Sequence, residues 1–402
     1  MAEIPMIISV DDHVVEPAHL WQTWLPEKHR ADAPYVERHG LGGLKYVGGT
    51  TYEYELTDDG PPCDIWFYEG KMYPHKRHVA SVGFERDDMT LSPITYDEMR
   101  PGCHEPKARV DDMVVNHVEA SLSFPTFPRF CGQTFAEARD KDLAMACVRA
   151  YNDWMVDEWC GDSDGALIPL CLIPLWDIEA AAAEIHRNAA RGVRAVCFSE
   201  IPSKLGLPSI HTGQWDPFFL ACQETRTVVC MHIGSSSRMP ATSPDAPFIV
   251  SSTLTFQNAM GSLLDFVYSG TLARFPKLVI AYSEGQVGWM PYLLERMDKL
   301  WHERSDNSFG TNLPEPPTSY IKGRVYGCIF DDETGLANRD RIGMDVICFE
   351  TDYPHADSTF PRSEAVAEEI CTNAGLNEEE TYKLLRGNAI KAFGLERYGI
   401  TA

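Results

Sequence analysis

Short, continuously apolar segments recur along the chain and alternate with amphipathic stretches. The apolar segments are rich in Val, Ile, Leu and Cys, and they lack the polar–apolar alternation of a half-exposed strand. This pattern is typical of parallel strands that are buried on both faces. We predict eight strands, at residues 7–10, 120–124, 166–173, 193–198, 228–232, 278–282, 325–330 and 346–350.

Helix-forming stretches follow most of these strands. We predict helices at 135–159, 178–191, 215–224, 254–275 and 289–304. Eight strands that mostly alternate with helices are the pattern of a (β/α)₈ or TIM barrel. A doubly wound open sheet is the main alternative, but no Gly-x-Gly-x-x-Gly sequence follows the first strand. We therefore expect an α/β fold of the TIM-barrel type.

The region from about 25 to 110 breaks this alternation. Clusters of Gly, Asp and Pro there flank β-rich segments such as 52–56 and 65–68. We predict a β-rich insertion after the first strand that covers the barrel mouth, within a single domain spanning residues 1–402.

Composition excludes several partners. The 35 basic and 59 acidic side chains give a formal net charge of −24, which disfavours nucleic acid and anionic membranes. No apolar run is long enough to cross a membrane, and the first residues do not form a secretion signal. The 12 cysteines are scattered, without a Cys-x-x-Cys pair. We therefore expect reduced, buried thiols in a cytoplasmic protein.

Candidate chemistry lies at the predicted strand ends, where barrel enzymes carry their reactive groups. Asp11 and His13 follow the first strand, and two residues of a strand that are separated by one position point the same way. His232 ends the fifth strand, Glu284 follows the sixth and Asp352 follows the eighth. Imidazole and carboxylate together suit Zn²⁺, with Mn²⁺ and Fe²⁺ as alternatives. Such an ion activates water or chelates a substrate oxyanion.

Each of these signals also has an ordinary structural interpretation. The Asp11-x-His13 pair resembles a turn or a cap, and His232 resembles a hydrogen-bonded core residue. Their coincidence at the ends of separate strands of one barrel favours the metal site. His75 and Arg77 belong to a basic run at 75–78, which is either a solvated loop or an anion-recognising lid over the barrel mouth.

Four motifs together resemble the amidohydrolase-2 family. They are Asp11-x-His13, His232, the Thr-Asp-Tyr-Pro-His sequence at 351–355 and the Gly-Asn-Ala sequence at 387–389. This family comprises metal-dependent barrel enzymes related to aminocarboxymuconate semialdehyde decarboxylase and γ-resorcylate decarboxylase. The resemblance implies that one divalent metal is bound, and that relatives form homodimers.

The resemblance covers residues 4–24 and 105–398 and extends to individual positions. Asp352 becomes either a ligand or the carboxylate that transfers a proton, and His355 is placed to orient it. The metal ligands that the resemblance implies are Asp11, His13, His232 and Asp352.

The sixth strand departs from the family pattern. Many relatives carry a histidine at its end, where this chain has Ser283-Glu284-Gly285. Glu284 then serves as the acid or base, as a further ligand, or as the partner of an arginine; we favour the first. No lysine ends the fourth strand, so the carbamylated lysine of dinuclear relatives has no candidate, and we expect one metal ion.

We therefore predict a metal-dependent enzyme that acts on a small cyclic or aromatic carboxylate. Family resemblance favours non-oxidative decarboxylation, in which Asp352 delivers a proton to the ring carbon as CO₂ departs. The alternative is hydrolysis of a C–C or C–N bond by metal-activated water, with Asp352 or Glu284 as the base. A further alternative is a barrel that binds a ligand without turnover.

Overall fold

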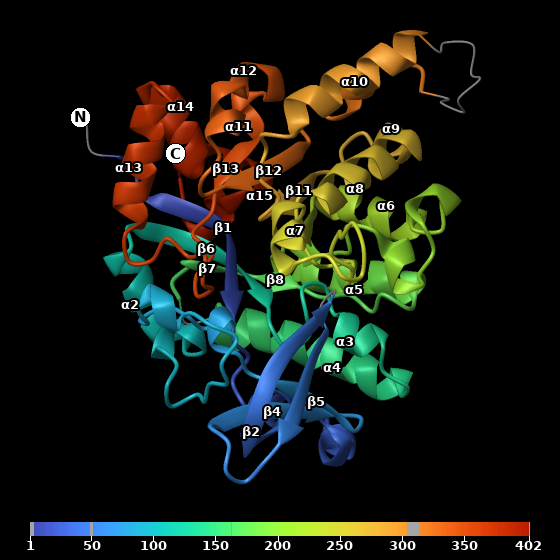
Figure 1. Cartoon of the computed structure of the whole chain (residues 1–402). Coiled ribbons are helices and arrows are strands. Elements are labelled where there is room, and N and C mark those ends of the chain that lie inside the picture. Colours follow the sequence, from blue (N-terminus) through green and yellow to red (C-terminus); the bar gives the residue numbers. More distant parts are fainter. Residues whose placement is uncertain (1–3, 49–50, 162, 304–312, 402) are drawn as a thin grey trace.

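The barrel strands are parallel and follow one another in chain order. The computed structural model describes residues 4–48, 51–161, 163–303 and 313–401. Backbone pairing runs from β1 through β6 to β7, and from β8 through β9, β10, β11 and β12 to β13 (Figure 1). The strands are β1 (Ile7–Val14), β6 (Val118–Pro125), β7 (Leu167–Ile168), β8 (Leu170–Cys171), β9 (Ala195–Cys197), β10 (Val228–His232), β11 (Ile280–Ser283), β12 (Val325–Ile329) and β13 (Ile347–Phe349).

The third barrel strand is divided in two. The sequence predicts one strand at 166–173, whereas β7 and β8 lie on either side of Pro169. Proline has no backbone N–H to give to a neighbouring strand, so the pairing is interrupted there. Because β7 pairs with β6 and β8 pairs with β9, the barrel wall continues across the break.

The barrel closes where the end of β13 meets β1. The Asp352 N–H donates to the Asp11 carbonyl at 3.0 Å, and the His13 N–H donates to the Tyr353 carbonyl at 2.6 Å. These bonds join the chain just after the last strand to the first strand. The closure therefore places three of the predicted site residues side by side.

The first strand is longer than predicted. Its apolar part, 7–10, matches the prediction, but β1 continues to Val14 and all eight residues are buried. Asp11 and His13 therefore belong to the strand itself. Hydrophobic patterning ends where polar side chains enter the barrel interior, and so it underestimates the length of the strand.

Helices form an outer layer around these strands. The segment predicted as one helix at 135–159 contains α3, α4 and a π-helical turn at Met155–Trp159. The segment predicted as one helix at 254–275 contains α8 and α9. The predicted end of 289–304 lies outside the described residues. The helices of the outer layer include α2 (Pro106–Val115), α3 (Gln133–Ala136), α4 (Lys141–Trp154), α5 (Ile178–Ala190), α6 (Asp216–Thr225), α8 (Gln257–Tyr268), α9 (Thr271–Arg274), α10 (Met290–Glu303) and α13 (Ser363–Asn373).

Shorter helices complete the chain. The side chains of Asp140, Asp177 and Asn377 accept backbone N–H groups at the first turns of α4, α5 and α14, which stabilises these helix starts. The short helices are α1 (Leu20–Trp24), α7 (Phe248–Thr253), α11 (Glu333–Ala337), α12 (Arg339–Ile342), α14 (Glu378–Tyr382) and α15 (Asn388–Phe393).

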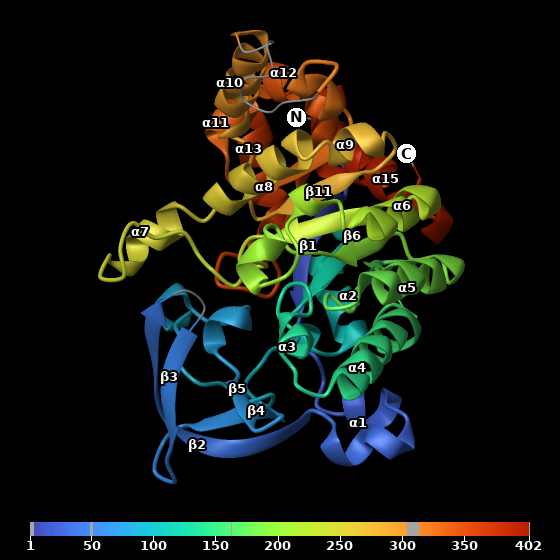
Figure 2. The same cartoon turned by 90° about the vertical axis from the view of Figure 1, so that its right-hand side faces the viewer.

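The segment between β1 and β6 contains the predicted β-rich insertion. Four antiparallel strands pair in the order β3-β2-β4-β5 and lie outside the barrel (Figures 1 and 2). Their bounds are β2 (Tyr35–Gly48), β3 (Thr51–Leu56), β4 (Pro62–Tyr68) and β5 (Lys71–Pro74).

The chain after β5 reaches the loop that follows β13. The Ser81 N–H donates to the Pro354 carbonyl at 2.7 Å, and the Ala356 N–H donates to the His78 carbonyl at 3.0 Å. These contacts lie at the end of the barrel where the strands finish. The limits of 25–110 and the covering of the mouth stay predictions.

The cysteines are all free thiols, and every one except Cys160 is buried. This agrees with the prediction of reduced, buried thiols. Within the described part of the chain, every helix is too short or too polar to span a bilayer.

Candidate metal centre

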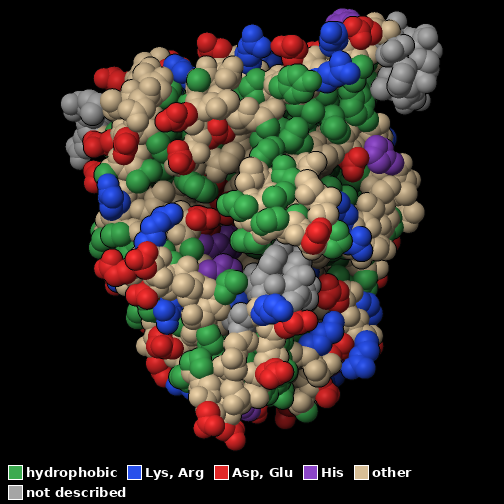
Figure 3. Space-filling view, in the orientation of Figure 1, with side chains coloured by type: hydrophobic (Ala, Val, Ile, Leu, Met, Phe, Trp, Pro, Cys, Tyr) green, Lys and Arg blue, Asp and Glu red, His purple; other side chains and the backbone are tan. Residues whose placement is uncertain are grey.

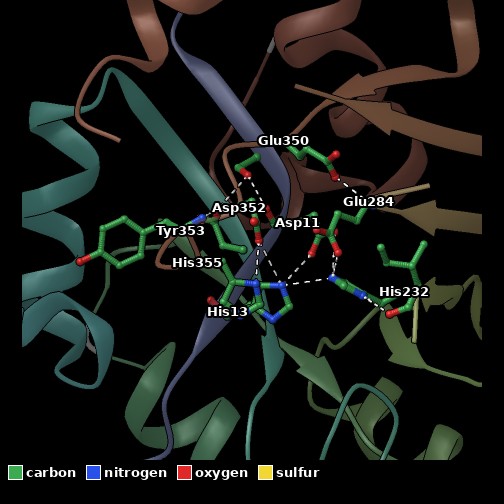
Figure 4. A network of polar contacts seen from close by, with 12 residues as sticks. Asp11, His13, His232, Glu284, Glu350, Asp352, Tyr353 and His355 are labelled. Carbon is green, nitrogen blue, oxygen red and sulfur yellow. Dashed lines mark hydrogen bonds and ion pairs between the residues drawn. The ribbon is translucent and has the colours of Figure 1, made fainter. Parts of the chain in front are cut away.

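Four side chains from β1, β10 and the loop after β13 converge at the strand ends (Figure 4). The His13 Nε2 lies 3.1 Å from the His232 Nε2 and 3.3 Å from the Asp352 Oδ1. The Asp11 Oδ2 lies 3.5 Å from the His232 Nε2, and its Oδ1 lies 3.7 Å from the His13 Nε2. The structure therefore brings together all four residues that the sequence singles out as metal ligands.

The atoms of this cluster suit a cation. Neither carboxylate oxygen of Asp11 has a hydrogen-bond partner among the described residues, although the side chain is fully buried. The His232 Nδ1 lies 2.6 Å from the Ile233 carbonyl, and in the tautomer that donates to it the Nε2 carries a lone pair. Since a buried carboxylate without a partner is costly, these residues fit a divalent metal bound among them.

Burial sets the protonation of the two imidazoles. It lowers the pKa of His13 well below its usual value and lowers the pKa of His232 to about 4. Both rings are therefore neutral near pH 7, which is the form that binds a metal. Burial raises the pKa of Asp11 well above its usual value, and the carboxylates of Glu350 and Asp352 raise it further. A cation at the centre would reverse this effect on Asp11.

Asp352 behaves in the opposite way. Burial would raise its pKa, but the neighbouring His355 and His13 outweigh burial and hold the pKa of Asp352 below its usual range. The His355 Nδ1 lies 3.1 Å from the Asp352 Oδ1, and its ring stacks on that of His13 with 3.6 Å between centroids. His355 thus makes the contact expected of a residue that orients Asp352, and that role stays a prediction.

Glu284 lies at the edge of the cluster, directly after β11. Its Oε2 is 3.3 Å from the His232 Nε2, and its side chain is 16% exposed, whereas the predicted ligands are at most 1% exposed. Burial and the charges of Asp352 and Glu350 raise the pKa of Glu284 well above its usual value. No arginine contact of its side chain occurs among the described residues, which leaves proton transfer and metal ligation. On the molecular surface, histidine and acidic side chains lie recessed in a hollow (Figure 3).

The side chains of His75 and Arg77 contact residues of the segment between β5 and β6. His75 is buried, with its Nε2 3.2 Å from the Tyr96 hydroxyl, so a solvated loop is the wrong interpretation for it. Burial lowers the pKa of His75 to about 4. Arg77 donates to the Asp88 carbonyl at 3.3 Å and lies over the Phe84 ring. A role for either residue as an anion-recognising lid stays a prediction.

Sequence reasoning missed two residues beside the cluster. Glu350 is fully buried, and its Oε2 accepts the Glu284 N–H at 3.1 Å and lies 2.6 Å from the Cys328 Sγ. Glu350 and Asp352 are separated by one position, as are Asp11 and His13. The same strand argument applied to the eighth strand would have found it.

Arg109 was also missed as a contact of the site. It is fully buried on α2, and it donates to the His13 carbonyl at 2.6 Å and to the Gly102 carbonyl at 2.8 Å. Its guanidinium lies 4.0 Å from the centroid of the Tyr353 ring. No pattern in the sequence distinguishes this arginine from exposed ones, because two of its partners, His13 and Tyr353, are distant in the chain.

Phe130 forms one wall of the centre. Its ring stacks on His232 with 4.2 Å between centroids and an interplanar angle of 6°. The phenyl ring supports one face of the imidazole, and so it limits the orientations that His232 can adopt.

Solved structures share this fold. An amidohydrolase from Mycobacterium avium subsp. paratuberculosis aligns with a TM-score of 0.68 at 20% identity, covering 97% of this chain and 99% of that one. A 5-carboxyvanillate decarboxylase from Novosphingobium aromaticivorans, complexed with manganese and a nitrobenzoic acid, aligns with a TM-score of 0.63 at 16% identity, covering 98% and 97%. A 2,6-dihydroxybenzoate decarboxylase from Rhizobium aligns with a TM-score of 0.61 at 16% identity, covering 98% and 100%.

These likenesses establish the barrel fold. The family model for amidohydrolases matches residues 18–395, which is nearly the whole chain. The match agrees with the resemblance found in the strand-end motifs. The chain belongs to the amidohydrolase family of enzymes.

Proposed function

We propose that the protein is a metal-dependent decarboxylase of a small cyclic or aromatic carboxylate. The observation that carries this proposal is the convergence of two neutral imidazoles and two carboxylates at the strand ends of the barrel. The similar decarboxylase structures favour carbon–carbon cleavage over hydrolysis.

We propose one catalytic ion, held by Asp11, His13, His232 and Asp352. Two imidazoles among carboxylates favour Zn²⁺. Mn²⁺ and Fe²⁺ are the alternatives, and the similar carboxyvanillate decarboxylase is complexed with manganese. When bound, such an ion supplies Lewis-acid stabilisation of negative charge on the substrate. The protein side chains then have to orient the substrate and move one proton.

The pKa values of Asp352 and Glu284 are shifted in opposite directions, which favours different roles for the two carboxylates. Asp352 is held ionised by His355 and His13, which suits a ligand better than a proton donor. Glu284 keeps a proton more readily, because burial and the neighbouring carboxylates raise its pKa. We therefore propose Glu284 as the group that gives the proton to the substrate carbon, in place of Asp352 as first expected.

Metal-dependent hydrolysis is the second candidate. The crowding of Asp11, Glu284, Glu350 and Asp352 favours a neutral substrate over an anion, and it supplies several carboxylates that can act as a base. In that reaction an ionised Asp352 would take a proton from the attacking water.

Cytoplasmic localisation and a homodimer stay predictions.

Release of CO₂ tests the proposal. Protein stripped with a chelator and reloaded with Mn²⁺ or Zn²⁺ is incubated with 2,6-dihydroxybenzoate, 5-carboxyvanillate and muconate-like acids. We expect metal-dependent CO₂ release that is lost in the His13→Ala, His232→Ala double variant. If these acids are inert while amides, lactones or diketones are consumed, the hydrolase is correct. If no substrate of either class is consumed by the metal-loaded protein, the barrel binds without turnover.

A further inference from the structure

We propose that Asp11, Cys328 and Glu350 form a second cation site, one step deeper in the barrel than the catalytic centre, for an ion of the Zn²⁺ class. This inference goes beyond the proposed function, which requires only the ion at the strand ends. Asp11 would serve both sites, because it faces the two histidines on one side and Glu350 on the other (Figure 4).

The three residues come from three adjacent barrel strands or their ends. Asp11 lies on β1, Cys328 on β12, and Glu350 follows β13. One ligand atom from each lies within 4.8 Å of the others, and all three side chains are fully buried. A thiolate with carboxylate oxygens is a donor set that Zn²⁺ and Co²⁺ accept, and that Mg²⁺ and Ca²⁺ avoid.

Unpartnered buried oxygens belong to two of the three residues of this site. The Glu350 Oε1 and both oxygens of Asp11 have no hydrogen-bond partner within the described ranges. Buried carboxylate oxygens are normally paired, because an unpaired buried oxygen loses its contact with water and gains no partner in return. A catalytic ion bound to one oxygen of Asp11 would leave its other oxygen and the Glu350 Oε1 unpaired, whereas the Glu350 Oε2 already accepts the Glu284 N–H and the Cys328 S–H.

The balance of charge supports a second ion. Glu284 keeps its proton as the proposed donor. The ionised groups of the two sites are then the Cys328 thiolate and the carboxylates of Asp11, Glu350 and Asp352, with a total charge of −4. One divalent ion offsets half of this charge, and a second offsets the rest. The buried guanidinium of Arg109 bonds to backbone carbonyls at His13 and Gly102 and to the Ser123 hydroxyl, so it forms no ion pair with these four groups.

Loading of the site requires the Cys328 thiol to lose its proton. The Sγ lies 2.6 Å from the Glu350 Oε2, which offers a route by which the proton can leave. The sulfur keeps its electron pair and forms the bond to the ion, and the proton is released to solvent. Each ion that binds at this site therefore releases at least one proton.

Cobalt provides the test, because a thiolate ligand gives Co²⁺ a charge-transfer absorption in the near ultraviolet that oxygen and imidazole ligands lack. We expect chelator-stripped wild-type protein to bind two equivalents of Co²⁺ or Zn²⁺, to show this absorption and to release protons. Cys328→Ser should remove the absorption and one equivalent, and Glu350→Gln should weaken the same equivalent. His13→Ala should remove the other equivalent and keep the absorption.

Cys230→Ser is the matched control. Cys230 is a buried thiol on β10 that lies outside the cluster, so this variant should keep both equivalents and the absorption. A wild-type protein that binds one equivalent without the absorption would overturn the proposal, since protons would then neutralise the carboxylates. The wild-type titration decides this even if a variant does not fold.

The two proposals fail separately. Cobalt–thiolate absorption in a protein that decarboxylates none of the acids would leave the second site standing and remove the proposed function. Release of CO₂ from protein that holds one equivalent without the absorption would do the reverse.

Discussion

The Nε2 atoms of His13 and His232 lie 3.1 Å apart, although 219 positions separate the two residues in the chain. One lies on β1 and the other ends β10, and these strands are not neighbours in the barrel. Two neutral imidazoles in this arrangement present lone pairs to one point. Only the closed barrel brings them together.

The first prediction concerns metal content. His13→Ala and His232→Ala should each weaken binding of the catalytic ion by at least about a hundredfold, because each removes one ligand of a buried centre. Metal analysis after dialysis against a buffered Zn²⁺ solution measures this. His186→Ala is the control, since His186 lies on α5 with its side chain 53% exposed. Equal metal content in all three variants would contradict the proposed ligands.

The second prediction separates Glu284 from Asp352. Glu284→Gln should lower kcat by about 10²–10⁴ and keep the metal, because it removes a proton donor. Asp352→Asn should lower both activity and metal affinity, because it removes a charged ligand. Parallel measurements of kcat and metal content distinguish them. Loss of metal in Glu284→Gln would make Glu284 a ligand instead.

The third prediction concerns pH and Glu200, which follows β9. Glu200 is fully buried, its carboxylate has no hydrogen-bond partner among the described residues, and burial raises its pKa to about 8. Because this pKa is raised in the folded state, the folded protein holds the proton more tightly than the unfolded chain. Stability therefore falls as pH rises from the ordinary glutamate value towards 8.

Glu200→Gln should remove this contribution. The variant should gain roughly 3–4 kcal/mol in unfolding free energy relative to the wild type between pH 5 and 9. Urea unfolding at several pH values measures the difference. Glu369→Gln, an exposed change on α13, should show no such trend. A constant difference across this pH range would show that Glu200 does not titrate as described.

The fourth prediction concerns Arg109. Arg109→Lys keeps the charge, but it cannot reach the His13 and Gly102 carbonyls in the same geometry, and it loses planar contact with the Tyr353 ring. We expect a loss of about 3 kcal/mol in stability, the size of a hydrogen bond made by a charged group, and weaker metal binding, because the backbone at His13 is no longer held. Lys107→Ala, at an exposed position of α2, should change neither. Wild-type stability in Arg109→Lys would contradict this account.

The sequence predicted the barrel and the main cluster because both depend on local patterns. Continuous apolar segments identify buried parallel strands, and Asp11, His13, His232 and Asp352 lie at or beside the ends of those strands. Pro169 shows the limit of this approach, since the apolar pattern continues through a residue that interrupts strand pairing.

The remaining contacts join residues that are separate in the sequence and meet only in the folded chain. Cys328 appears in the sequence as one buried thiol among many, yet its Sγ adjoins the Glu350 carboxylate. His75 appears as part of a solvated run, yet its ring is buried against Tyr96. Periodicity reports which face of a strand or helix is buried. It does not report which side chain of another strand stands opposite.

Fold class and the candidate residues at the strand ends were therefore readable from the chain alone, because hydrophobic periodicity and the rule that barrel enzymes act at strand ends are local or topological. The family resemblance implied which of these residues are metal ligands, and that assignment stays a prediction. The protonation of the site, the anchoring by Arg109 and the grouping of Asp11, Cys328 and Glu350 required the folded structure. These features arise from burial and from interatomic distances between distant segments, and both exist only once the barrel has closed.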